Sequence, residues 1–405
     1  MRYLTLEIER LLREETKMAF IAGPRQVGKT TLAKHLLASY SAGYFNWDIE
    51  SHRKKILKDP ITFWAQIQPP SNKKQRIVLD EIHKYPRWKR FLKGFFDANG
   101  TRLETVVTGS GRLDLYQRGG DSLFGRYALY RLHPFTLGEL LSSGEKIVLS
   151  PDVFWNEVLS KIPKTECEEV LQNLERFSGF PEPLFAASET RLRRWRAAHH
   201  RLVIREDLRD LTRIREVGLV EALVTLLPER IGAPLSINAI SEDLQVAFNT
   251  VKLWIEALSR LYYLFEIRPF AGKLSRTLRR EAKVYLFDPS EIKEKGRQFE
   301  NIVALHLRKL TDAWNDWGLG EFKLYYVRDK EKREVDFLIT SDGKPYCLIE
   351  SKLSDETVSP ALIYFRERFR PKVTLQIVRD LKSNYARKTA SEIWIVSAAQ
   401  FLSCV

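Results

Sequence analysis

One segment constrains the fold of this 405-residue chain more than any other: Gly23-Pro24-Arg25-Gln26-Val27-Gly28-Lys29-Thr30, followed by Thr31. It lies between a short apolar run, MAFIA (18–22), and a helix-like run, TTLAKHLLASY (30–40). In this context the glycines predict a loop whose backbone N–H groups turn inward around an anion, at the amino end of a helix that adds partial positive charge. We therefore predict that residues 23–31 bind phosphate groups.

Within the loop, Lys29 has the charge to neutralise phosphate, and Thr30 has a hydroxyl of the kind that Mg²⁺ accepts. Two carboxylates elsewhere in the sequence complement these side chains. Further along the chain, the apolar run Ile77-Val78-Leu79 ends in Asp80 and Glu81. Because open α/β sheets bind ligands at the carboxyl ends of their strands, we expect Asp80 to hold Mg²⁺, directly or through water. Glu81 would orient or deprotonate an attacking water, unless the pair is a strand-end turn with two exposed acids.

Two other residues are candidates for the same site. Ser110 ends the run ETVVTGS (104–110), where we expect a polar side chain beside the terminal phosphate. Arg126 lies at the start of the next strand-like run and would stabilise charge on the transferred phosphoryl group, as an arginine finger or a sensor within the chain. An ordinary surface arginine is the alternative for Arg126.

The apolar runs recur with helix-like or loop segments between them, at 18–22, 43–49, 76–81 and 104–110. This alternation predicts an α/β layer with a parallel sheet that helices cover on both faces. Beyond residue 145 the strands stop, and residues 150–225 are typical of charged helices. We therefore predict three domains, at 1–145, 146–290 and 291–405.

Residues 235–270 have helix-turn-helix spacing, with a short helix, a tight turn at QVAF (245–248) and a longer helix. We expect Asn249 to cap the second helix, with Thr250, Lys252 and Glu256 facing outward. The apolar face of this helix would consist of Val251, Ile255, Leu258 and Tyr262. The segment 268–287 then offers six basic residues and one acid between two strand-like runs, which is typical of the wing of a winged helix.

Charge favours a polyanionic partner. The chain has 66 Lys and Arg residues and 52 Asp and Glu residues, a formal net charge of +14, and we expect double-stranded DNA as the partner. Nine arginines and three acids lie between Arg191 and Arg215, as a solvated helix face or a binding strip. A basic surface that only aids solubility is the alternative reading of the net charge.

Other site types are not indicated. The three cysteines, Cys167, Cys347 and Cys404, lie far apart and form no C-x-x-C pair, so the sequence indicates neither a disulfide framework nor a zinc site. No apolar run approaches the ~18 residues of a membrane span, and the amino-terminal segment lacks the apolar core of a signal peptide. We expect a cytoplasmic protein that has no membrane partner.

A second group of charged residues lies in the last quarter of the chain. Glu300 lies in a helix-like segment, Asp336 in the strand-like run REVDFLIT, and Glu350 and Lys352 in CLIESKL. Because side chains alternate along a strand, Glu350 and Lys352 share one face. Carboxylates at Glu300, Asp336 and Glu350 can hold Mg²⁺ or Mn²⁺, and with Lys352 they can polarise a water for phosphodiester cleavage. An ordinary charged hairpin is the alternative.

The chain as a whole resembles a prokaryotic family of AAA-like P-loop ATPases fused to a C-terminal domain of unknown function. The resemblance covers nearly the full length and rests on GPRQVGKTTL, IVLDEIHKYPRW, VVTGS, SLFGRYALYRLHPFTLGEL, GFPEPL, SRLYYLFEIRPF, AKVYLFDPS, FENIVALHL, EVDFLI and IESK. It implies an α/β P-loop NTPase core, a helical and winged-helix middle region, and a C-terminal α+β domain of the restriction-endonuclease-like PD-(D/E)-x-K type. One departure is Ile82-His83-Lys84 after the two acids, which makes any partner contact of that loop specific to this chain.

Three functions are consistent with these patterns. The first is an ATPase that binds ATP and Mg²⁺, hydrolyses ATP and associates with DNA through the winged helix, while the nuclease-like domain cuts or grips the DNA. The second is a nucleotide-dependent switch that binds a protein partner, or a second copy of the chain, and whose nuclease-like domain is inactive. The third is regulation of a nuclease without ATP turnover.

Overall fold

The computed structural model of the chain describes residues 2–37, 43–67, 74–109, 123–142, 150–208, 216–271, 281–381 and 386–405. Contacts between Cα atoms divide the chain into two units, Met1–His133 and Pro134–Val405. The first boundary thus lies before the predicted position at residue 145. Among the described residues, no helix is both long enough and apolar enough to cross a membrane.

The first unit is a parallel α/β sheet. Its described elements are α1 (Thr5–Glu14), β1 (Met18–Ala22), α2 (Lys29–Leu36), β2 (Tyr44–Asn46), α3 (Glu50–Lys58), β3 (Gln75–Asp80), η1 (Ile82–Lys84), α4 (Trp88–Asn99), β4 (Leu103–Thr108) and β5 (Tyr127–Arg131). The described strands pair in the order β2-β3-β4-β1-β5, and every pair is parallel. This confirms the predicted parallel sheet.

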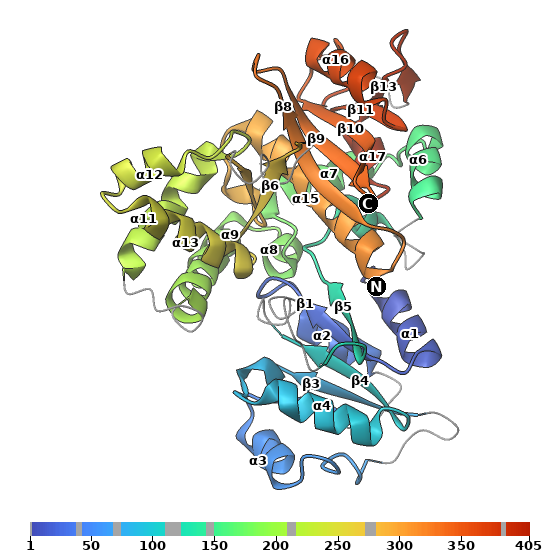
Figure 1. Cartoon of the computed structure of the whole chain (residues 1–405), viewed down its shortest axis with the longest axis vertical. Coiled ribbons are helices and arrows are strands. Elements are labelled where there is room, and N and C mark those ends of the chain that lie inside the picture. The colour runs from blue at the N-terminus through green and yellow to red at the C-terminus, as the bar shows by residue number, and fades with distance from the viewer. Residues whose placement is uncertain are drawn as a thin grey trace. The chain divides into compact units, whose positions relative to one another are not determined.

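Helices cover this sheet on both faces. Alternate strand residues such as Phe20, Leu79 and Val107 form one buried cluster with side chains of α3 and α4, and α4 lies across the sheet in Figure 1. Helices α1 and α2 contact the strands β1, β3 and β4 but contribute nothing to that cluster, so they pack on the opposite face. Burial on both faces explains why the strands are near-continuous apolar runs.

The second unit begins with helices. Its described helices before the hairpin are α5 (Leu137–Leu141), α6 (Pro151–Ser160), α7 (Cys167–Phe177), α8 (Pro181–Ala186), α9 (Glu189–His200), the π-helical η3 (Arg201–Asp207), α11 (Val217–Leu226), η4 (Leu227–Arg230), α12 (Ile237–Asp243) and α13 (Phe248–Arg260). This run of helices agrees with the predicted helical middle region.

A mixed sheet follows. Its strands are β6 (Leu264–Pro269), β7 (Lys283–Leu286), β8 (Phe322–Arg328), β9 (Glu334–Ser341), β10 (Lys344–Lys352), β11 (Val373–Val378), β12 (Arg387–Lys388) and β13 (Trp394–Ser397). The helices among them are η5 (Pro289–Glu291), α15 (Lys295–Asp316), α16 (Pro360–Phe369) and α17 (Ala398–Leu402). Helix α15 packs against β7, β8, β9 and β10, and α16 packs against β9 and β10.

The sheet joins the middle and C-terminal regions. Within the described residues its order is β12-β13-β11-β10-β9-β8-β6-β7, in which β6 pairs in parallel with β8 through Arg268–Tyr325 and Pro269–Tyr326. The hairpin β6–β7 therefore extends the C-terminal sheet, which is why the contacts do not separate residues 146–290 from 291–405 as two units.

The helix-turn-helix spacing corresponds to α12 and α13, with one correction. Helix α13 begins at Phe248 with Ala247 as its N-cap, so Asn249 lies within the first turn and the prediction that it caps the helix is wrong. Val251, Ile255 and Leu258 form the buried face as predicted, whereas Tyr262 is buried but lies beyond the end of α13 at Arg260, with φ 58°. Four of the six basic residues assigned to the wing fall at positions 272–280, outside the described residues.

His306 on α15 is a buried neutral imidazole. The backbone N–H of Leu137 donates to its Nε2 at 3.2 Å, so the ring proton is on Nδ1, which lies 2.8 Å from the carbonyl oxygen of Ile302. Burial lowers the pKa of His306 to about 3.

This histidine predicts acid sensitivity of the second unit. In the unfolded chain His306 takes up a proton below about pH 6.5, whereas the folded unit resists protonation down to about pH 3. Its contribution to stability is therefore present above pH 6.5 and is lost as the pH falls, at about 1.4 kcal/mol per pH unit. Denaturant titrations across this range should show a shallower pH slope for His306→Gln than for the wild type, and equal slopes would contradict the assignment.

Candidate functional site

The loop between β1 and α2 has a backbone that glycine makes possible. Gly23 has φ 148°, Gln26 has φ 60° and Gly28 has φ 98°. At Gly23 a Cβ atom would lie 2.3 Å from the carbonyl oxygen of Leu132, so only glycine fits there. The loop ends at the amino terminus of the eight-residue helix α2, a position where backbone N–H groups bind phosphate.

Charged side chains hold this loop in shape. The buried Lys29 ammonium donates to the carbonyl oxygens of Gly23 at 2.9 Å and Pro24 at 2.5 Å, so its charge lies inside the loop. From the amino-terminal segment, the Arg2 guanidinium donates to the carbonyl oxygen of Val27 at 2.8 Å and to that of His133. Arg2 was not predicted, because nothing local in the sequence links it to residues 23–31.

The remaining loop residues differ in exposure. Val27 is buried, Arg25 is half-buried, and Gln26 and Thr31 are exposed. Solvent therefore reaches the side chains of Arg25, Gln26 and Thr31 but not that of Val27.

Asp80 is the buried acceptor at the centre of the site. It lies at the carboxyl end of β3 with 1% exposure, and its Oδ2 accepts from the Thr30 hydroxyl at 2.9 Å and from the Tyr44 hydroxyl at 2.5 Å. The hydroxyl of Thr108, at the end of β4, donates to the other carboxylate oxygen, Oδ1. The side-chain nitrogen Nδ2 of Asn46 lies 3.4 Å from Oδ2. Burial and the hydrogen bond to Asp80 raise the pKa of the Tyr44 phenol.

These contacts extend the predicted site. Thr30 and Asp80, predicted from separate motifs, are brought together, and their hydroxyl and carboxylate oxygens fit the preference of Mg²⁺ for oxygen ligands. Tyr44, Asn46 and Thr108 were not predicted. The feature that could have identified them is their position at or near the carboxyl ends of β2 and β4, the two strands that flank β3.

Glu81 follows Asp80 in a left-handed backbone conformation, with φ 57°. Its N–H donates to the carbonyl oxygen of Thr108 at 3.2 Å. The half-buried carboxylate lies 3.3 Å from the Lys84 ammonium, which also contacts Asp48 at 2.6 Å, and 3.8 Å from His83 Nε2. Two residues of the Ile82-His83-Lys84 departure therefore position Glu81.

The structure does not bring Arg126 to this site. Its carbonyl oxygen accepts from the N–H of Met18, at the amino end of β1, whereas Gly23 follows the carboxyl end of that strand. A five-residue strand separates the two ends, about 16 Å at the usual rise. Arg126 instead pairs with Asp97 at 2.7 Å, so a role as a sensor within the chain does not fit this placement. Ser110 lies outside the described residues.

The acids of the C-terminal region also converge. Lys352 contacts Glu350 at 2.8 Å, and Glu350 Oε2 lies 3.4 Å from the backbone nitrogen of Asp336. Glu300 is linked to Asp336 through Lys283 of β7, which is one of the six basic residues predicted to belong to a wing. Lys283 is 1% exposed, so its assignment to an outward-facing basic wing is wrong.

The environment of this cluster disfavours charge on Glu300 and Glu350. Burial, together with the neighbouring Asp336 carboxylate, raises the pKa of Glu300 to about 7 and that of Glu350 to about 8. Burial alone would lower the pKa of an ammonium, yet Glu300, Asp336 and Glu334 raise the pKa of Lys283 above its ordinary value. Among the described residues, no group of three or more His, Cys, Asp and Glu side chains is arranged to hold a metal ion.

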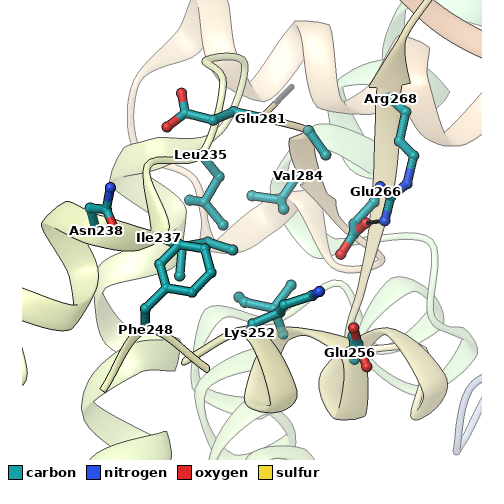
Figure 2. Close-up of a pocket in the computed structure, with 12 residues that line it drawn as sticks. Leu235, Ile237, Asn238, Phe248, Lys252, Glu256, Glu266, Arg268, Glu281 and Val284 are labelled. Atoms are coloured by element: carbon teal, nitrogen blue, oxygen red, sulfur yellow. Dashed lines mark hydrogen bonds and ion pairs between the residues drawn. The ribbon is translucent and has the colours of Figure 1, made fainter. Parts of the chain in front are cut away.

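A groove of about 500 Å³ lies between the helices α12 and α13 and the hairpin β6–β7 (Figure 2). Its apolar walls are formed by Leu235, Ile237, Phe248, Ile255 and Val284. Its charged residues are Glu256, Glu266, Glu281, Lys252 and Arg268, and Arg268 is already paired with Glu266 at 2.8 Å. The groove is therefore mixed in charge, with an acidic excess.

A basic surface lies on α9 and η3. The exposed arginines there are Arg191, Arg193, Arg194, Arg201 and Arg205. Arg205 pairs with Glu221 at 2.6 Å, and the other four form no ion pair with a described residue. The exposed Phe185 of α8, at 67% exposure, lines a shallow cavity with Arg191 and Arg194.

The fold and the phosphate loop define the class of the first unit: it is an AAA-type P-loop domain. Residues 15–141 match the family described as AAA domain. Residues 169–292 match a domain of unknown function, DUF8612, and residues 295–400 match another, DUF4143.

Two relatives are proteins described as uncharacterized, from Mycobacterium bovis and Mycobacterium tuberculosis. Each is 22% identical over 353 residues, which cover 85% of this chain and 72% of the relative. Among solved structures, a Walker-type ATPase of Pyrococcus abyssi is 18% identical with a TM-score of 0.38, covering 71% of this chain and 93% of that one. The ORC1 protein of Aeropyrum pernix in complex with DNA is 15% identical with a TM-score of 0.33, covering 75% and 93%. At these TM-scores neither structure bears on the activity or partners of this chain.

The conformation of Gly23 predicts a specific substitution effect. Gly23→Ala places a methyl group against the Leu132 carbonyl in a backbone conformation that alanine avoids, so it should lower the free energy of unfolding of the first unit by about 2 kcal/mol or more. The matched control is Gly94→Ala in α4, where a Cβ atom meets nothing within 4 Å. That change should raise stability by up to about 1 kcal/mol. Thermal unfolding of both variants provides the measurement, and equal melting temperatures would contradict the loop geometry.

Proposed function

We propose that this chain binds ATP with Mg²⁺ and hydrolyses it in the first unit. The observation that carries the proposal is the 2.9 Å hydrogen bond between Thr30 and Asp80, which places two oxygen ligands suited to Mg²⁺ beside the phosphate loop. Thr30 or Asp80 alone would not distinguish a loop that binds only phosphate from a site that binds a nucleotide together with Mg²⁺.

Each residue of the site has a role that follows from its position. The backbone N–H groups at the start of α2 and the Lys29 ammonium would bind the phosphates, and Thr30 and Asp80 would hold Mg²⁺. When bound, Mg²⁺ supplies positive charge to the phosphate oxygens. Glu81, next in sequence to Asp80, would accept a proton from the attacking water, and its ion pair with Lys84 at 3.3 Å would orient the carboxylate.

The roles of Lys29 and Glu81 are separable by mutation. Lys29→Ala removes the charge inside the loop and should abolish nucleotide binding, whereas Glu81→Gln keeps the shape of the side chain and should retain binding while hydrolysis falls by about 10²–10⁴-fold. Equilibrium binding of a fluorescent ATP analogue and steady-state phosphate release measure the two effects. Equal loss of binding in both variants would contradict the assigned roles.

Arg126→Ala serves as the control for position. Because Arg126 lies at the opposite end of β1 from the loop, this variant should bind ATP as the wild type does. Reduced hydrolysis at unchanged affinity would indicate that Arg126 acts as an arginine finger toward a second copy of the chain.

We further propose that the second unit associates with double-stranded DNA. The net charge of +14 and the exposed arginines of α9 and η3 support this, because lysine and arginine side chains bind phosphate groups and release counterions. The groove beside α13 supports it less, because Glu256 and Glu281 would repel phosphates there. We therefore assign the DNA contact to the α9 surface rather than to that groove.

The salt dependence of binding tests the α9 surface. Replacing Arg191 and Arg194 together by Gln should lower the slope of log affinity against log salt by about 2, since each phosphate contact contributes about 0.9. Replacing Arg368 and Arg370 of the α16 region by Gln removes the same charge elsewhere and should leave the slope nearly unchanged. Electrophoretic binding across a salt series, with and without ATP, gives both slopes. Equal effects of the two double variants would contradict a localised surface.

A nucleotide-dependent switch with a protein partner is the second candidate. The observation that favours it is the groove beside α13, whose apolar walls include the 45% exposed Phe248, with the 61% exposed Leu253 nearby on the same helix. Exposed apolar side chains with mixed charge are more typical of a protein interface than of a DNA interface. Hydrolysis that DNA does not affect, with no salt-dependent DNA affinity, would favour this candidate.

Metal-dependent DNA cleavage forms no part of the proposal. Such cleavage needs a divalent cation among Glu300, Asp336 and Glu350, and the Lys283 ammonium lies between the first two of these acids.

A further inference from the structure

Four carboxylates converge near the hairpin β6–β7: Glu300 from α15, Glu334 and Asp336 from β9, and Glu350 from β10. Oxygen ligands in this number are a donor set that suits a divalent cation. The space among three of them is filled by an ammonium group of the chain itself. Lys283 Nζ lies 2.8 Å from Glu334 Oε1, 3.2 Å from Glu300 Oε1 and 3.7 Å from Asp336 Oδ1.

The position of Lys283 is fixed by the sheet. Strand β7 pairs with β6 on one side, and on its other side Pro234 bridges to Lys283 itself. Side chains alternate along β7, so Ala282 and Val284 line the groove of Figure 2, whereas Lys283 and Tyr285 face Glu300. With 1% exposure, Lys283 has little room to leave the acids without displacement of β7.

The carboxylate oxygens are also occupied by other donors. Glu300 Oε1 accepts from the Tyr285 hydroxyl at 2.7 Å. Its Oε2 lies 2.6 Å from the position that a Cβ atom on Gly232 would take, so the backbone of this glycine packs against the second carboxylate oxygen. Asp336 Oδ2 accepts from both the N–H and the hydroxyl of Ser351, at 2.9 and 2.8 Å.

The same is true of Glu350. Its Oε1 contacts the Lys352 ammonium at 2.8 Å, and its Oε2 lies 3.4 Å from the backbone nitrogen of Asp336. The acids of the cluster are therefore arranged around lysines and backbone groups.

A divalent cation and the Lys283 ammonium cannot share this space, because two positive charges within a few ångströms repel strongly away from bulk water. We infer that Lys283 takes the place of a divalent cation, so that the acid cluster is an internal ion network that excludes Mg²⁺ and Mn²⁺. The metal implied by the resemblance to PD-(D/E)-x-K domains does not fit the side chains present. The network instead ties β7, in the region 169–292, to α15 and β9, in the region 295–400.

Manganese binding to the full chain, without nucleotide, tests this inference. Electron paramagnetic resonance of free Mn²⁺ should give the same binding curve for the wild type and for Asp336→Asn, because no ion is held at the cluster in either. Any weak binding at the phosphate loop is common to both proteins and cancels in this comparison. A wild-type site that Asp336→Asn abolishes would overturn the inference.

Removal of the ammonium gives the converse test. Lys283→Met replaces the charged side chain with an unbranched apolar one that is only one atom shorter, and it should gain an Mn²⁺ site with affinity about tenfold or more above the wild type, lost again in Lys283→Met with Asp336→Asn. Lys352→Met is the matched control, since it removes a lysine from the same cluster but leaves Lys283 in place, and it should gain no such site. A folded Lys283→Met protein that binds no Mn²⁺ would also overturn the inference. If that variant does not fold, the wild-type comparison with Asp336→Asn still decides.

Discussion

The Asp80 carboxylate is the constraint on which the first unit depends. A buried carboxylate is costly unless hydrogen bonds compensate for the loss of water, and Asp80 is 1% exposed. Its donors come from α2, β2 and β4, so three elements must end at one place for the acid to be stable there. The same convergence sets Thr30 beside Asp80 at the mouth of the phosphate loop. The contacts that stabilise Asp80 are thus the same ones that bring together the oxygens of the proposed magnesium site.

The parts of this site that lie close together in sequence could be predicted, and the parts that depend on strand order could not. The loop at 23–30 and the pair Asp80-Glu81 are each defined by a few residues and by the strand that precedes them. Tyr44 and Thr108 reach Asp80 only because β2 and β4 flank β3, which no local pattern specifies. Arg126 is the converse case. Its place at the start of a strand was expected, but the parallel register with β1 puts it at the end of the sheet away from the loop.

In the second unit the same distinction separates the predicted acids from the lysine among them. Spacing and strand alternation single out Glu300, Asp336, Glu350 and Lys352, and these side chains do converge. Lys283 lies in a run of basic residues that resembles a DNA-binding wing, and composition alone predicts it to face outward. The pairing of β6 with β8, together with the two-residue period of β7, directs it into the cluster instead. The motif specifies Glu300, Asp336, Glu350 and Lys352, but it does not specify Lys283, whose ammonium group changes the environment of the acids.

The two faces of the hairpin β6–β7 therefore make different contacts. One face lines a groove with apolar walls and an acidic excess, and the other supplies the ammonium that neutralises Glu300 and Glu334. Since Ala282 and Val284 flank Lys283 in the sequence, a ligand that displaced β7 toward or away from α13 would also change the contacts of Lys283. Exposed arginines of the second unit lie elsewhere, on α9 and η3. The surface to which we assign the proposed DNA contact is therefore separate from the groove that favours a protein partner.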